Sequence, residues 1–393
     1  MFIFIRKKNL NTKFKHMQYL IGVIITFFLA FLLITKSNKT LADRILFFWL
    51  IGIGFHLYLF YLSFTGQSYN YPYLLGFVIP LPLIHGPFLY LYTASVTNQL
   101  SNIYKNILHF FPVLISYISL SSFFQLPSET KIQVFENEGL GYETLLLTNL
   151  IATYLSGIIY VIWSFFLLKR HKSNIMNTFS YTERINLYWL RYLVYGIGIL
   201  WLFVIIGEDE LLFSITVVFV IFIGYFGINQ VGIFTKKKYS TSNEIVQIEK
   251  TEKRIIERES NNDNENNTRL KYEKSGLSNE TAIEIHQLLT NKMKEKQLFI
   301  NPEITLIELA EILNVHPNNL SQVINTFENK NFYDFINTKR IELFLTLIAK
   351  PENKKFTILS IAFDCGFNSK SSFNKYFKKE TNLTPSEYIK SIT

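Results

Sequence analysis

The sequence contains a single cysteine, Cys365, and therefore has no intrachain disulfide framework. It also lacks the short motifs of several enzyme classes, because it contains no Walker loop, no G-x-G-x-x-G and no H-E-x-x-H. Charged residues make up only 18% of the chain, against an average of about 25%. These absences exclude a disulfide-stapled domain and give no support to those enzyme classes, so no catalytic activity is expected.

The positive charge that is present is distributed unevenly. Residues 1–235 carry 15 Lys/Arg and 9 Asp/Glu, residues 236–274 carry 10 and 8, and residues 275–393 carry 14 and 13. Most of the net charge of +9 therefore lies in the first part, and the basic balance alone is poor evidence for nucleic-acid binding. The shift in composition divides the chain into a hydrophobic half (1–235), a polar linker (236–276) and a C-terminal domain (277–393).

Long apolar runs dominate the hydrophobic half. Seven of them come close to the ~20 residues that a helix needs to cross a bilayer. They lie near 17–34, 45–64, 73–97, 107–124, 145–168, 187–206 and 211–234. A large soluble helical core would show polar faces at helical spacing, whereas these segments are apolar all round. We therefore expect an all-α chain, in which a seven-span membrane helix bundle precedes the C-terminal domain.

Basic residues in the loops predict the orientation of this bundle. The loops on one side carry 11 Lys/Arg and those on the other carry only Lys131. By the positive-inside rule the C-terminus is cytoplasmic, in a multi-pass protein of the inner (cytoplasmic) membrane. Seven spans place the N-terminus outside, although residues 1–16 hold five basic residues. Either Met17 rather than Met1 is the true start, or one of the seven segments does not span.

Three histidines, His56, His85 and His109, fall inside the predicted spans. Prolines surround His85 in the stretch Pro80–Pro87, and prolines within a helix remove backbone donors and can open a cavity. One interpretation is a ligand pocket around His85 that includes the other two histidines. The alternative is packing and interfacial anchoring. Because the histidines lack accompanying Cys or clustered Asp/Glu, we expect no metal and no cofactor.

The linker, residues 236–276, is charged and Asn-rich, most clearly in residues 261–267. Such a composition cannot bury a core, which predicts a flexible segment. A short amphipathic helix through Ile245–Ile256 is the alternative for its first part.

Two copies of one pattern, 305–325 and 357–378, begin about 52 residues apart in the C-terminal domain. Each predicts two short helices joined by a tight turn. In the first copy, Thr305 and Glu308 have capping-box spacing, and Pro317 suits the first position of the second helix. In its first helix, one buried face contains Leu306, Leu309, Ala310 and Leu313. In its second helix, the residues that face the core are Leu320, Val323 and Ile324.

The second copy repeats this arrangement with different residues. Gly366 can supply the positive φ of the turn, and Ser369 can cap the helix that follows. Phe373 and Phe377 anchor that helix. The predicted buried stripe of the preceding helix is Ile358, Ile361, Ala362 and Cys365.

Both second helices leave polar side chains exposed. These are Asn318, Ser321, Gln322 and Asn325 in the first copy, and Lys370, Ser371, Asn374 and Lys375 in the second. Amide, hydroxyl and ammonium groups of this kind read base edges in the major groove. The second helix of a helix-turn-helix is the element that enters that groove. An ordinary solvent-facing surface is the alternative interpretation.

Residues 283–393 resemble the DNA-binding domain of AraC/XylS-type regulators. The strongest match is Ile361–Lys378 followed by Thr384–Tyr388, against the pattern I-A-x-x-x-G-F-x-S-x-S-x-F-x-R-x-F-K and then G-x-T-P-x-x-Y. Lys375 stands where Arg is usual, and Asn382 stands where Gly is usual. Residues 331–341 are similar to the central helix of that domain. The hydrophobic half is similar in layout to the membrane regions that some regulators of this type carry.

The resemblance implies a membrane-anchored, sequence-specific transcription regulator that couples a signal in or across the membrane to transcription. It implies double-stranded promoter DNA as a partner beside the lipid bilayer and an unidentified signal ligand, with RNA polymerase and a second copy of this chain as candidates. The expected phosphate contacts are Lys339, Lys354, Lys355, Lys378 and Lys379. The alternative functions are a membrane enzyme, or a transporter, with a regulatory helical tail.

Overall fold

The computed structural model describes residues 13–100, 102–182, 187–206, 209–229 and 277–392. The predicted linker at 236–276 and Met1 lie outside these residues, while Met17 falls within the first helix. Throughout the described residues the fold is helical, with an isolated bridge between Phe179 and Thr305 and no strand. This confirms the expected all-α class.

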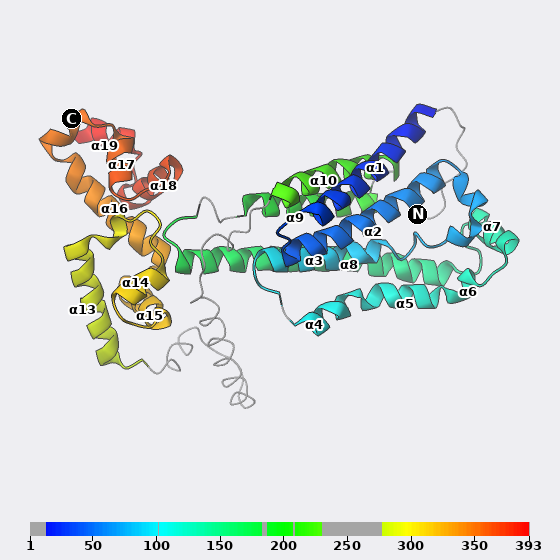
Figure 1. Ribbon diagram of the computed structural model, residues 1–393, viewed down its shortest axis with the longest axis horizontal. Helices are drawn as coiled ribbons and strands as arrows, with labels where there is room; N and C mark the ends of the chain where they lie inside the picture. The colour runs from blue at the N-terminus through cyan, green and yellow to red at the C-terminus, as the bar shows by residue number, and fades with distance from the viewer. Residues whose placement is uncertain (1–12, 101, 183–186, 207–208, 230–276, 393) are drawn as a thin grey trace. The chain divides into compact units, whose positions relative to one another are not determined.

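The chain forms two compact units (Figure 1). Unit 1 contains residues 1–171 and 187–232, and unit 2 contains residues 172–186 and 233–393. Unit 2 is therefore discontinuous in sequence, because it includes a short segment from the middle of the hydrophobic half. Each unit is described separately below.

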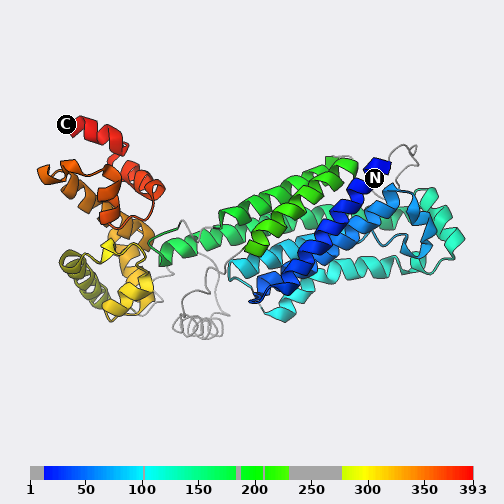
Figure 2. The ribbon, with the colours of Figure 1, turned by 45° about the horizontal axis from the view of Figure 1, so that its top comes forward.

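Unit 1 is built from ten helices within the described residues, and the longer ones run side by side (Figures 1 and 2). They are α1 (Lys13–Thr35), α2 (Leu41–Phe64), α3 (Pro82–Val96), α4 (Ile103–Ile107), α5 (Phe111–Ser119), α6 (Ser121–Phe124), α7 (Ser128–Glu136), α8 (Glu143–Thr178), α9 (Tyr188–Ile206) and α10 (Asp209–Asn229). Short 3₁₀ turns lie at Gln67–Asn70, Pro72–Leu74 and Leu108–Phe110. From Lys172 onward, α8 continues into unit 2.

Two helices of the described residues, α2 and α8, are long and apolar enough to cross a membrane, with mean hydropathies of 2.0 and 1.9. Shorter apolar helices occupy Leu20–Thr35, Tyr188–Val204 and Leu212–Gly227. These five helices coincide with five of the seven predicted spans. The seven-span arrangement therefore stays a prediction.

The other two predicted spans, 73–97 and 107–124, are not single helices. In the first, only Pro82–Val96 is α-helical, and Pro82 lies at the start of that helix instead of kinking it. The preceding residues form turns, where Gly76 has φ of +86°. In the second, three short helices and turns follow one another, and Pro112 lies in the first turn of α5. The physical reason is that proline supplies no N–H to a preceding turn and so favours a helix start.

Unit 2 is an all-helical domain within the described residues. It contains α13 (Asn279–Lys296), α14 (Leu306–Ile312), α15 (Pro317–Glu328), α16 (Phe332–Ile348), α17 (Ile358–Asp364), α18 (Lys370–Thr381) and α19 (Pro385–Ile392), with 3₁₀ turns at Leu298–Ile300 and Pro351–Lys355. Helices α14 and α15 form the first helix-turn-helix, and α17 and α18 form the second.

Helix α16 joins the two helix-turn-helix units through separate hydrophobic cores. Phe332, Phe335 and Ile336 pack into the first core with α13, α14 and α15. Ile341 and Phe344 pack into the second core with α17 and α18. Because opposite parts of one rigid helix serve both cores, α16 fixes the position of one helix-turn-helix against the other.

Candidate functional site

The first helix-turn-helix has the local structure that its sequence predicts. The Thr305 hydroxyl accepts a hydrogen bond from the backbone N–H of Glu308, and the Glu308 carboxylate accepts one from the N–H of Thr305. Pro317 occupies the first turn of α15, and the ring of His316 caps this helix by accepting from the N–H of Asn318. Ala310 is fully buried, which lets α15 cross closely over α14.

The second helix-turn-helix has the same kinds of helix cap and a tight turn between its helices. Thr357 caps α17 and Ser369 caps α18, each by accepting a hydrogen bond from a backbone N–H three residues later. Gly366 in the turn has φ of +95°, and Asn382 ends α18 in the left-handed conformation with φ of +61°. The predicted core residues Cys365, Phe373 and Phe377 are buried, as are Ile361 and Ala362.

The predicted base-reading side chains of α15 lie on the accessible side of that helix. Asn318 is exposed, and Ser321, Gln322 and Asn325 are half-buried. Within the described part of the chain, none of these four side chains makes a side-chain hydrogen bond to another residue. Their polar groups are therefore available to a partner.

The corresponding side chains of α18 are all exposed, namely Lys370, Ser371, Asn374 and Lys375. The Ser371 hydroxyl lies 3.1 Å from the hydroxyl of the capping residue Ser369, so it also has a local structural role. The Lys375 ammonium lies 5.9 Å from the centre of the Tyr376 ring.

A broad groove of about 980 Å³ runs beside α18 and the start of α19. Its basic lining residues are Lys370, Lys375, Lys378 and Lys379. From residue 350 onward the chain carries 8 Lys and 4 Asp/Glu. Since Lys neutralises phosphate without reading sequence, this groove fits the backbone of a nucleic acid.

The five predicted phosphate contacts differ in their surroundings. Lys378 is exposed and lines the groove. The Lys379 ammonium forms an ion pair with the Asp334 carboxylate at 3.2 Å, and the Lys339 ammonium forms one with the Glu342 carboxylate at 2.9 Å. The Lys355 ammonium lies 5.1 Å from the Phe356 ring. Lys354 belongs to the turn Pro351–Lys355, but its side chain lies outside the described residues.

A polar cluster on α16 had no counterpart in the sequence analysis. Arg340 is 1% exposed and donates five hydrogen bonds, to the backbone oxygens of Phe299, Asn301 and Ser180, the Ser180 hydroxyl and the Asn337 side chain. Ser180 follows α8, and its N–H donates to the Ile304 carbonyl at 3.3 Å. The Arg340 guanidinium also lies 5.8 Å from the centre of the Phe367 ring in the second core. One side chain, called here the Arg340 clamp, therefore contacts this segment and both helix-turn-helix cores.

A second buried contact connects α16 to α18. The Tyr376 hydroxyl donates to the Asp334 carboxylate, which also pairs with Lys379. Burial raises the pKa of Tyr376, and the adjacent carboxylate raises it further. The phenol therefore stays protonated and serves as a donor.

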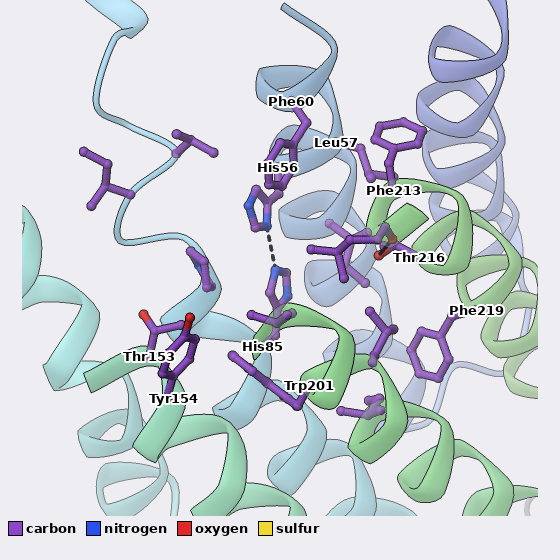
Figure 3. A pocket seen from close by; sticks show the side chains of 18 of the residues that line it. His56, Leu57, Phe60, His85, Thr153, Tyr154, Trp201, Phe213, Thr216 and Phe219 are labelled. Carbon is purple, nitrogen blue, oxygen red and sulfur yellow. Dashed lines mark hydrogen bonds between the residues drawn. The ribbon is translucent and has the colours of Figure 1, made fainter. Parts of the chain in front are cut away.

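The three histidines that the sequence analysis singled out lie in two separate places in unit 1. His56 on α2 and His85 on α3 are paired, with Nδ1 of His56 2.9 Å from Nε2 of His85 (Figure 3). Both line one cavity. His109 does not line this cavity. Its Nδ1 lies 3.0 Å from the hydroxyl of Tyr160, which is also outside the cavity wall. Among the described residues, no group of three or more His, Cys, Asp or Glu is arranged to hold a metal ion.

A family described as "Helix-turn-helix domain" matches residues 309–391, which cover α15 to α18 with most of α14 and α19. Comparisons with curated proteins and with solved structures gave no match. Together with the motifs at 361–388 and the geometry above, the family match supports a DNA-binding transcription regulator of the AraC type.

Proposed function

We propose that this chain is a membrane-anchored regulator that binds specific promoter DNA from the cytoplasmic face of the inner membrane and responds to a signal in the membrane. The observation that carries the proposal is the pair of accessible polar faces on α15 and α18, each the second helix of a helix-turn-helix. Side chains of these types discriminate base edges, and the adjacent lysines bind phosphate.

Exposed apolar surface on unit 1 supports the membrane anchor. Phe28, Phe48, Leu108, Leu202 and Val218 are each between 56% and 68% exposed. In the most apolar stretch of α8, only 22% of the residues are buried. A soluble core helix would bury such residues, whereas a bilayer solvates them.

The Arg340 clamp supports coupling between the membrane and the DNA-binding unit. Helix α8 contributes residues to unit 1 and, from Lys172 onward, to unit 2. Ser180 lies two residues beyond the end of this helix and accepts hydrogen bonds from Arg340 on α16. A displacement of α8 along its axis would therefore act on the helix that positions both recognition helices. RNA polymerase and a second copy of the chain are candidate partners of the DNA-bound state.

The direct test is selection of duplex DNA from a random pool by the full chain in lipid nanodiscs. We expect recovery of one motif whose binding weakens steeply as the salt concentration rises. A folded chain with no preference over competitor DNA would refute sequence-specific regulation.

Gln322→Ala is expected to relax sequence preference at one base pair of the selected motif. A two-point amide contact to adenine is worth about 1–3 kcal/mol, and its loss should be confined to that position. Competition titrations against single-base variants of the motif measure this. An equal loss on every variant would show that Gln322 does not read a base.

Two further variants calibrate that measurement. Lys378→Ala should weaken binding to all sequences equally and lower the salt slope by about 1, as loss of a phosphate contact does. Lys292→Ala on α13, whose ammonium lies 4.0 Å from Glu295, should change neither property.

The single buried cysteine makes the topology testable without a cysteine-free background. Burial, together with the nearby Asp364 carboxylate, raises the pKa of Cys365 to about 12, so the native thiol should not react with maleimide. In intact cells an impermeant maleimide should label a Glu129→Cys chain but not an Asn38→Cys chain, whose label should appear only after permeabilisation. The reverse pattern would place the DNA-binding unit outside the cytoplasm and exclude the proposed function.

A further inference from the structure

Unit 1 contains a cavity of about 160 Å³ between α2, α3, α8, α9 and α10 (Figure 3). Its wall is mainly aromatic and aliphatic, and includes Trp49, Phe60, Trp201, Phe213 and Phe219. Three of its labelled polar side chains are His56, His85 and Thr153. Apolar cavities of ~150 Å³ hold a molecule the size of benzene. The space therefore suits one apolar ring.

Hydrogen bonds determine which nitrogens of the histidine pair carry protons. The Trp49 indole N–H, which can only donate, donates to Nδ1 of His85 at 3.3 Å. His85 therefore carries its proton on Nε2 and donates it to Nδ1 of His56 at 2.9 Å. Because Nδ1 of His56 accepts, the neutral ring of His56 has its proton on Nε2. Trp49, His85 and His56 thus form a directed relay that ends in an N–H donor.

The end of this relay has no acceptor. Nε2 of His56 is buried, and no described residue offers it a hydrogen-bond partner. The hydroxyl of Thr153, on α8 in the same cavity wall, is likewise buried without a partner among the described residues. Buried polar atoms are rarely left unsatisfied, since each such atom costs about 1–3 kcal/mol. Two of them in one wall indicate a site for a polar atom of a ligand.

We propose that this cavity binds a neutral one-ring molecule whose carbonyl oxygen accepts the hydrogen bond from Nε2 of His56. This assignment rests on the proposed function, because it identifies the chemical class of the signal. A carboxylate ligand is disfavoured, because it would lose its hydration in an apolar cavity. A cation would be repelled by the donor, and the cavity wall contains no Asp or Glu. A carbonyl accepts without adding a donor that needs its own partner.

The molecule can reach the cavity from water or from the lipid. The same aryl ketone chemistry is available as acetophenone, which is water-soluble, and as dodecanophenone, which carries the same head group on an acyl chain and partitions into the bilayer. Tighter binding of dodecanophenone, after correction for its partition into empty nanodiscs, indicates access from the lipid. Tighter binding of acetophenone indicates access from water.

The test is calorimetric titration of the full chain in nanodiscs with acetophenone and with α-methylstyrene, in which a methylene group replaces the carbonyl oxygen. We expect acetophenone to bind about five- to tenfold more tightly, the equivalent of one net hydrogen bond. Equal affinities in the native chain would overturn the proposal. In ¹⁵N-histidine spectra of a chain with seven histidines, acetophenone should also shift the Nε2–H signal of His56 downfield.

Matched variants identify the donor. His56→Phe keeps a ring and removes the N–H, so the two ligands should then bind equally. His56→Gln restores a donor and should recover part of the preference. His109→Phe is the control, because His109 pairs with Tyr160 outside the cavity and should not affect the preference. A ketone preference that persists in His56→Phe would also overturn the proposal.

Trp49→Phe tests the relay itself. Without the indole donor, His85 can carry its proton on Nδ1 and accept at Nε2, so His56 no longer needs to donate from Nε2. The ketone preference should fall toward that of His56→Phe. None of these titrations contains DNA, so their failure is distinct from failure of the DNA selection. If the ketone binds as expected but does not change the affinity of the chain for DNA, the ligand site is supported and its role in regulation is refuted.

Discussion

Gly366→Ala should unfold the second helix-turn-helix under conditions in which the native chain is folded. Gly366 has φ of +95°, and a Cβ at this position would lie 2.6 Å from the Ile300 carbonyl oxygen and 2.7 Å from that of Phe299. Both are backbone atoms, which cannot move aside as a side chain end can. Backbone strain of about 1–3 kcal/mol and overpacking of a similar ~1–3 kcal/mol together remove a large share of the roughly 5–15 kcal/mol that stabilises a typical domain.

Pulse proteolysis of the full chain in nanodiscs, over a range of urea concentrations, measures the stability of unit 2 against this change. Asn382→Ala is the matched control, because that residue has φ of +61° and is exposed, so it tests left-handed strain without a backbone collision. We expect it to cost about 1 kcal/mol. An equally small cost for Gly366→Ala would mean that the turn moves away from Phe299 and Ile300.

Arg340→Ala is expected to lower the free energy of unfolding of unit 2 by about 3–5 kcal/mol. The change removes five hydrogen bonds and leaves the carbonyls of Phe299, Asn301 and Ser180 without that donor. Breaking a buried charged network costs this much, because the remaining partners stay buried. The urea midpoint in the proteolysis experiment gives the value.

Lys339→Ala is the adjacent control for Arg340. Its ammonium forms a surface pair with Glu342, which is worth about 0–1 kcal/mol. Arg340→Lys keeps the charge but lacks the planar fork, so it should recover only part of the loss. A midpoint for Arg340→Ala that equals that of Lys339→Ala would show that the clamp adds no stability.

Local signals in the sequence predicted both helix-turn-helix units. The capping spacing of Thr305 and Glu308, the first-turn position of Pro317 and the left-handed turn at Gly366 each depend on neighbours a few residues away. The amphipathic stripes likewise predicted the buried residues Leu306, Leu309 and Ala310 of α14 and Ile361 and Ala362 of α17, whereas Ile358 of the second stripe is half-buried. These features follow from periodicity and backbone preference, which a single sequence displays directly.

The Arg340 clamp could not be predicted in this way, because Arg340 and Ser180 are 160 residues apart in the chain. A weaker signal was present. Ile336, Arg340 and Phe344 are spaced four residues apart, and all three are buried on α16. A charged residue in an apolar helical stripe indicates a buried polar partner, but it does not identify that partner.

In the hydrophobic half, the sequence indicated which histidines to consider but not which of them meet. His56 and His85 form a pair, whereas His109 pairs with Tyr160. The difference arises from helix packing, which hydropathy does not encode. Apolar composition also predicted continuous spans over 73–97 and 107–124, where prolines start new helices instead. Hydropathy measures the preference for lipid, and proline determines where a helix can begin.

The separation of Ser180 from Arg340 has a consequence for synthesis of the chain. The ribosome makes Ser180 before α9 and α10, and Arg340 after them. The clamp can therefore form only after the chain has grown 160 residues past Ser180. In the proposed topology it closes only if α9 and α10 have both crossed the bilayer or have both failed to cross, since a single misinserted helix places the two residues on opposite sides. A chain with one misinserted helix would present an incomplete DNA-binding unit to cytoplasmic proteases. In that topology, the clamp would link survival of the chain to correct membrane insertion.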